Sequence, residues 1–79
     1  MITAEVAVYP MKTSNATNAI NNSINTLKAN NVSYTVNSMN TQLTGTKAQI
    51  FNSLESMFTE AENTGGEVSM VVTITNASK

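Results

Sequence analysis

Residues 2–9, ITAEVAVY, alternate between apolar positions and other residues, and this period of two predicts a β-strand. One face of that strand carries Ile2, Ala4, Val6 and Val8, and the other carries Thr3, Glu5, Ala7 and Tyr9. Pro10 ends the run and favours an extended backbone at the residue before it. The opening pattern therefore predicts a strand that stops at a Tyr-Pro pair.

A helical period follows the polar loop that ends at Ser14. Apolar residues recur at Ala16, Ile20, Ile24 and Leu27, which places them on one face of a helix. Thr13 or Ser14 is expected to cap the start of this helix. Asn30-Asn31 is expected to end it, since asparagine tolerates the left-handed conformation that closes many helices.

Alternation returns after this helix and predicts a hairpin. Its first strand carries Val32, Tyr34 and Val36, and a two-residue turn at Met39-Asn40 leads to a return strand that starts at Thr41. In that register Ser38 faces Thr41, Val36 faces Leu43 and Tyr34 faces Gly45. The apolar residues of both strands then lie on one face.

A second helix and a last strand complete the chain. Thr46 and Gln49 have the spacing of a capping box, and Thr64-Gly65-Gly66 is a helix stop. Between them lies a broad apolar face of Ile50, Phe51, Leu54, Met57, Phe58 and Ala61. Residues 68–75, VSMVVTIT, alternate again and predict the last strand.

The predicted order is βαββαβ, the α+β pattern of a ferredoxin-like fold. Right-handed crossovers arrange it as a four-stranded antiparallel sheet of order 4-1-3-2, with both helices on one face. Residues 1–79 are expected to form one such domain.

Composition narrows the function classes. The chain has no cysteine and no histidine, so the usual zinc, copper and iron–sulfur ligands are missing and no metal or cofactor is expected. Four lysines and a net charge of −1 do not form the basic stripe of a nucleic-acid-binding protein. No apolar run approaches a membrane span, and a cytoplasmic protein is expected. The scattered glutamates and lysines suggest no catalytic residues, so no enzyme is expected.

The predicted topology brings one end of the first strand beside the hairpin. Tyr9 and Met11 should meet Ser38, Asn40 and Thr41 there, and this cluster is the first candidate binding site. Each residue also has a purely structural interpretation. Tyr9 would then be a packing residue rather than a stacking platform, and Met11 would fill a loop rather than wall a pocket.

The face of the sheet without helices is the second feature. Its predicted residues are polar but almost uncharged, rich in threonine, with Glu5 as the only carboxylate. Such a face suits packing against a second sheet, because threonine hydroxyls satisfy one another across strands. A solvated face is the alternative. Glu5 would be either a satisfied structural group or the anion that recognises an amine or cation of a ligand.

The stretches AVYPM, NTQLTG and VSMVVTIT, in this order, resemble the YkoF-like family of small thiamine-binding proteins. The resemblance covers essentially the whole chain. It implies a ferredoxin-like fold, tetramers of single domains or dimers of tandem repeats, sheets paired face to face, and binding of thiamine or its hydroxymethylpyrimidine moiety. The positions that match the family's motifs are Tyr9, Pro10, Met11 and Thr41. Ser38, Asn40 and Glu5 are added from the predicted geometry alone.

The expected function is therefore a non-catalytic binding protein for thiamine or hydroxymethylpyrimidine that acts as a homo-oligomer through the helix-free sheet face. The alternative is a structural or regulatory ferredoxin-like assembly module without a small-molecule ligand. Saturable ligand binding distinguishes the two.

Overall fold

The structure, a computed structural model, describes residues 1–11 and 14–77. Its elements follow the predicted order. They are β1 (Ile2–Met11), α1 (Ala16–Ala29), β2 (Ser33–Val36), β3 (Thr41–Gly45), α2 (Lys47–Gly65) and β4 (Glu67–Thr75). Neither helix in the described part of the chain combines the length and hydropathy of a membrane-spanning segment.

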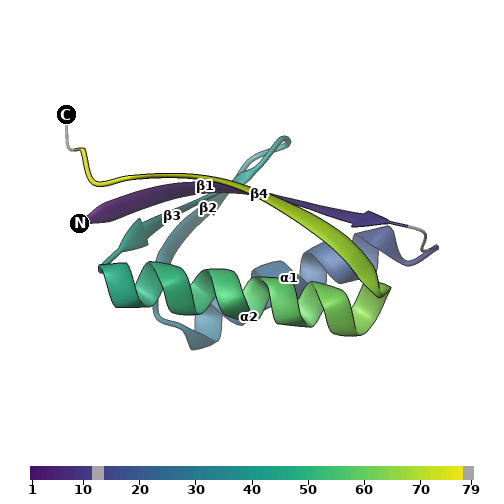
Figure 1. The fold of residues 1–79 in the computed structure, drawn as a ribbon. Helices are drawn as coiled ribbons and strands as arrows, with labels where there is room; N and C mark the ends of the chain where they lie inside the picture. The colour runs from purple at the N-terminus through teal and green to yellow at the C-terminus, as the bar shows by residue number, and fades with distance from the viewer. Residues whose placement is uncertain (12–13, 78–79) are drawn as a thin grey trace.

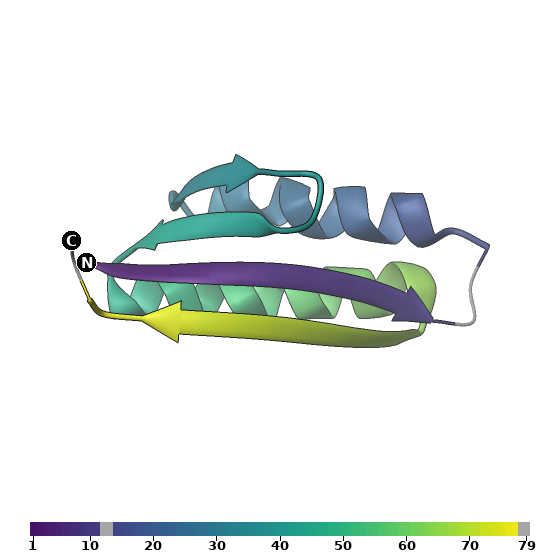
Figure 2. The same cartoon turned by 90° about the horizontal axis from the view of Figure 1, so that it is seen from above.

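The strands form one antiparallel sheet in the order β2-β3-β1-β4. Both helices lie against the same face of this sheet (Figure 1). Seen from above, α1 runs on the side of β2 and β3, whereas α2 runs beneath β1 and β4 (Figure 2). The ferredoxin-like fold, the strand order and the single helical layer are therefore confirmed.

The core lies between the sheet and the helices. Its buried residues are Ala4, Val6, Leu27, Val32, Leu43, Ile50 and Met57. The strand residues among them are the inward positions that the alternation predicts, and each inward side chain removes apolar surface from water.

The helix ends follow their local chemistry with one exception. Thr46 and Gln49 form the complete capping box, and Gly66 has a φ of 81° after the last turn of α2. Asn31 has a φ of 56° just beyond α1, as expected for a left-handed stop. The N-cap of α1 is Asn15 rather than Ser14. The Asn15 side chain forms no capping hydrogen bond, so this helix start does not depend on the N-cap chemistry from which Ser14 was predicted. The other expected cap, Thr13, lies outside the described residues.

The broad apolar face predicted for α2 is only partly used. Ile50, Met57 and Ala61 are buried, but Phe51 and Phe58 remain 53% and 38% exposed. Ser53 is fully buried instead, on a helix that packs closely against α1. The neighbouring helix occupies one flank of α2, so the buried stripe is turned away from the two phenylalanines.

Candidate functional site

The two ladders of β1 have different lengths. Its pairing with β3 ends at Val6 and Thr41, whereas its pairing with β4 continues to Met11 and Glu67. β1 therefore extends past the hairpin and has no β3 neighbour from Ala7 onward. In a strand every second residue directs its N–H and C=O toward that side, so the uncovered edge is polar.

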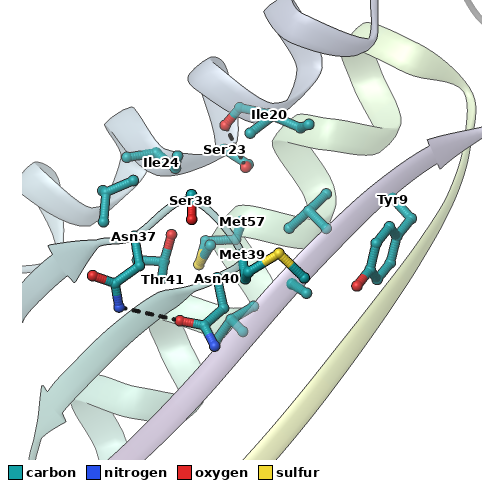
Figure 3. Close-up of a pocket in the computed structure, with 14 residues that line it drawn as sticks. Tyr9, Ile20, Ser23, Ile24, Asn37, Ser38, Met39, Asn40, Thr41 and Met57 are labelled. Carbon is teal, nitrogen blue, oxygen red and sulfur yellow. Dashed lines mark hydrogen bonds between the residues drawn. The ribbon is translucent and has the colours of Figure 1, made fainter.

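A cavity of about 250 Å³ lies beside this uncovered part of β1, between β1, α1 and the hairpin loop (Figure 3). Its apolar lining consists of Val6, Ala7, Val8, Ile20, Ile24, Val36, Met39 and Met57. Its polar lining consists of Tyr9, Ser23, Asn37, Ser38, Asn40 and Thr41. Apart from the Tyr9 phenol, no ionisable side chain among the described residues lines it. The cavity is thus apolar-walled, with neutral hydroxyl and amide groups.

The hairpin loop differs from the expected one. Val36 faces Thr41 and Tyr34 faces Leu43, so the register is shifted by two residues and the loop has four, Asn37 to Asn40. The Asn37 N–H donates to the Asn40 carbonyl over 2.8 Å. An even shift keeps every side chain on its predicted face. It also moves Ser38 from the predicted strand into the loop that borders the cavity, where Asn40 lies as predicted.

Asn37 reinforces this loop through its side chain. Its amide Nδ2 donates to Asn40 Oδ1 over 3.4 Å, a long contact that joins the two ends of the loop (Figure 3). Met39 lies at the tip and is 80% exposed. The loop thus presents hydroxyl and amide groups beside the exposed apolar side chain of Met39, which borders the cavity.

Thr41 is 5% exposed and occupies an inward position of β3. Its hydroxyl is therefore directed to the helix side of the sheet, where the cavity lies. Ser23 is fully buried on α1, and its hydroxyl donates to the Ile20 carbonyl over 2.8 Å. Because that proton is used within the helix, the Ser23 oxygen faces the cavity as an acceptor.

Tyr9 stands at the mouth of the cavity. It is 52% exposed and belongs to the outward positions of β1, together with Glu5 and Ala7. It also borders a second, shallow depression of about 200 Å³ on the helix-free face, which Met39 and Asn40 line as well. Tyr9 therefore connects the two hollows.

The predicted cluster divides between these places. Tyr9, Ser38, Asn40 and Thr41 line the main cavity. Glu5 lines only the shallow depression, where Gln42 Nε2 donates to its Oε2 over 3.1 Å across the β1–β3 ladder.

Met11 lies further along β1 and borders neither hollow. The Ser69 hydroxyl donates to the Met11 sulfur over 3.3 Å across the β1–β4 ladder. The expected approach of Met11 to the hairpin is therefore not observed. The strand continues by two residues past Tyr9, and this length carries Met11 to the start of β4.

Sequence reasoning missed the wall that α1 supplies, which consists of Ile20, Ser23 and Ile24. Their spacing is that of an ordinary core stripe, so the pattern does not separate core from cavity. The useful signal is the difference in length between the first strand and the hairpin strands.

Comparison with known proteins identifies a matching family and several solved structures with the same fold. The model of the YKOF-related family matches residues 1–78. No curated protein sequence matches significantly. A Streptococcus pneumoniae protein superposes with a TM-score of 0.90 at 19% identity, over 98% of this chain and 87% of its own.

Two further structures share the fold. A domain of unknown function from Bacillus cereus superposes with a TM-score of 0.87 at 22% identity, over 96% of this chain and 75% of its own. A Thermotoga maritima protein, provisionally named a thiamine biosynthesis/salvage protein, superposes with a TM-score of 0.80 at 18% identity. The match covers 92% of this chain and 80% of its own. At these low sequence identities, the structural similarity establishes that the proteins share a fold.

Proposed function

This chain belongs to the YKOF-related family, and we propose that it is a non-catalytic binding protein for thiamine or its hydroxymethylpyrimidine moiety. The pyrimidine ring of the ligand occupies the cavity between β1, α1 and the hairpin loop. The provisional name of the Thermotoga maritima protein, which shares this fold, supports the same ligand class.

One observation carries the proposal: the cavity is apolar-walled, neutral and edged by hydroxyl and amide groups. A flat aminopyrimidine needs this combination, because its faces are apolar and its ring nitrogens and amino group exchange hydrogen bonds. Sites for drug-sized ligands measure about 300–1,000 Å³. A volume of about 250 Å³ therefore suits one ring rather than both rings of thiamine.

The roles of the polar groups follow from their positions. Thr41, Ser38 and Asn40 exchange hydrogen bonds with the nitrogens of the pyrimidine. The thiazolium ring of thiamine remains at the mouth beside Tyr9, whose ring attracts a cation by about 0.5–2 kcal/mol. Glu5, in the adjoining depression, supplies a negative charge for the same cation or accepts from an amino group. Met11 contributes to the binding site only indirectly, through the contact of its sulfur with the Ser69 hydroxyl near the start of β4.

Binding without turnover fits the same lining. General acid–base catalysis needs a titratable group within hydrogen-bond reach of the reacting atom. The described lining offers hydroxyls and amides for recognition and a single phenol at the mouth. We therefore expect the ligand to leave chemically unchanged.

The helix-free face is the proposed contact between copies of this cytoplasmic protein. Its exposed residues include Thr35, Gln42, Thr73 and Val71, of which Val71 is 57% exposed. A second sheet packed on this face would bury the threonines against one another and enclose the Glu5 depression. This almost uncharged face also supports the second candidate function, an assembly module without a ligand.

Isothermal titration calorimetry of the purified protein tests the proposal. Thiamine and hydroxymethylpyrimidine are the titrants, and thiamine monophosphate is the third. We expect saturable heat with the first two and at least tenfold weaker binding of the phosphate ester, because no described cation lines the cavity. No heat with any titrant, from a folded and oligomeric protein, would leave the assembly module as the function. Tight preference for the phosphate ester would contradict the neutral site.

A further inference from the structure

Asn40 belongs to both hollows beside the hairpin loop. It lines the main cavity and also the shallow depression on the helix-free face, a position that it shares with Ala7, Tyr9 and Met39. Among these four residues only Asn40 carries an amide, which donates through Nδ2 and accepts through Oδ1. The direction of this amide therefore decides whether a ligand in the cavity meets a donor or an acceptor.

Asn37 fixes that direction. Its backbone N–H donates to the Asn40 carbonyl over 2.8 Å, and its side-chain Nδ2 donates to Asn40 Oδ1 over 3.4 Å (Figure 3). The oxygen and nitrogen of a planar amide lie on opposite sides of the group, so Asn40 Nδ2 is directed away from Asn37. No other hydrogen bond in the described part of the chain uses Asn40 Nδ2. The loop thus presents an N–H donor whose orientation is set from within the loop.

An oriented amide discriminates between ligand atoms more strictly than a hydroxyl does. The hydroxyls of Ser38 and Thr41 rotate to donate or to accept, so they suit either a ring nitrogen or an amino group. The Nδ2 end of Asn40 only donates, and a ligand satisfies it only with an acceptor. A ligand that places a C–H group there leaves the N–H without a partner, which costs binding free energy.

We propose that Asn37 is a positioning residue that sets the hydrogen-bond direction of Asn40, and that Asn40 Nδ2 donates to a ring nitrogen of the bound pyrimidine. This inference rests on the proposed function and deepens it, because it names the kind of ligand atom that the loop selects. Asn37 acts on the ligand through Asn40. The loop accordingly favours rings with an acceptor nitrogen at this edge over rings with C–H at the same place.

Calorimetry with matched ligands measures this selection. The ligands are hydroxymethylpyrimidine and its two pyridine analogues, in each of which one ring nitrogen is replaced by C–H. We expect one analogue to bind the wild type about 2- to 12-fold more weakly than hydroxymethylpyrimidine, the loss of one hydrogen bond. The ratio of these two dissociation constants is the selectivity that the variants should change. Equal binding of hydroxymethylpyrimidine and both analogues would contradict the proposal.

Asn37→Asp reverses the polarity of the pair. A carboxylate does not donate, so Asp at this position accepts from Asn40 Nδ2 and turns Asn40 Oδ1 toward the ligand. We expect hydroxymethylpyrimidine to bind at least fivefold more weakly and the selected analogue to bind no more weakly than before, so that the ratio falls to one or inverts. Asn25→Asp is the control, because it adds the same charge at an exposed position of α1 that lines neither hollow. It should keep the wild-type ratio.

A double-mutant cycle with Asn40→Ala separates positioning from direct contact. Without the Asn40 amide, Asn37→Asp should change the selectivity no further. An unchanged ratio in Asn37→Asp, an equal change in Asn25→Asp, or a full effect of Asn37→Asp in the Asn40→Ala background would overturn this inference while binding to the wild type upholds the proposed function. No heat from the wild type with hydroxymethylpyrimidine would overturn both.

Discussion

Val6 of β1 lies opposite Thr41 of β3, and this is the last residue pair in the ladder between those strands. Beyond it β1 continues toward Met11 while the hairpin turns back. The cavity exists because the central strand is longer than its neighbour. Val6 and Thr41 both line it, so the point where the ladder ends is also the base of the candidate site.

The first prediction concerns the Thr41 hydroxyl. Thr41→Val keeps the shape of the side chain and removes its hydrogen bond to the ligand, a loss of about 0.5–1.5 kcal/mol, or roughly 2- to 12-fold in affinity. Calorimetry with hydroxymethylpyrimidine measures the change. Thr44→Val, three residues along β3 on the other face, is the control and should bind as the wild type does. Equal affinities for Thr41→Val and wild type would remove Thr41 from the site.

The second prediction concerns the Tyr9 ring. Tyr9→Ala should weaken thiamine binding by about 0.5–2 kcal/mol, because the cation at the mouth loses an aromatic face. Uncharged hydroxymethylpyrimidine should be much less affected, and Tyr9→Phe should retain affinity for both.

A melting curve accompanies these titrations. Tyr9 is half exposed, so the alanine variant should melt and assemble nearly as the wild type does. A large fall in melting temperature with unchanged affinity would identify Tyr9 as a packing residue.

The third prediction concerns the Ser53 hydroxyl, which is buried in α2 with no hydrogen-bond partner among the described residues. Ser53→Ala removes an unsatisfied group and should raise the free energy of unfolding by about 1 kcal/mol. Ser56→Ala on the same helix reports the gain from helix propensity alone, at most about 0.7 kcal/mol. Urea unfolding compares the two variants, and a Ser53→Ala protein less stable than wild type would contradict the prediction.

The fourth prediction concerns Gly45, whose added Cβ would lie 2.7 Å from Gln49 Oε1. That oxygen accepts from the Thr46 N–H over 2.9 Å in the capping box. Gly45→Ala should displace the Gln49 side chain and lower the free energy of unfolding by about 0.5–1.5 kcal/mol, one hydrogen bond.

A double-mutant cycle with Gln49→Ala checks this mechanism. If the loss comes from the capping box, Gly45→Ala should cost little more once Gln49 is alanine. Fully additive losses would point instead to Val32 Cγ2 and the Gln49 Cβ, each 3.3 Å from the new Cβ and both still present in Gln49→Ala.

Local patterns determined the elements and their faces. Alternation placed Ala4 and Leu43 inward, and both are fully buried. Capping chemistry located the start of α2, because Thr46 and Gln49 satisfy each other's backbone groups within four residues. The strand order followed from the handedness of two crossovers. All of these depend on interactions between near neighbours or on general chirality, which a sequence carries in full.

The predicted topology already brought Tyr9, Ser38, Asn40 and Thr41 together, but only the tertiary structure decided the cavity that they line. The hairpin register depended on the hydrogen bonds between Asn37 and Asn40 across the loop. Because a shift of two residues leaves every side chain on the same face, the alternation of apolar residues does not distinguish the two registers. The burial of Ser53 and the exposure of Phe51 depended on where α1 packs against α2. The cavity arose from the unequal reach of β1 and β3, a relation between distant segments. Sequence periodicity reports which face a residue occupies, but only packing decides what lies opposite it.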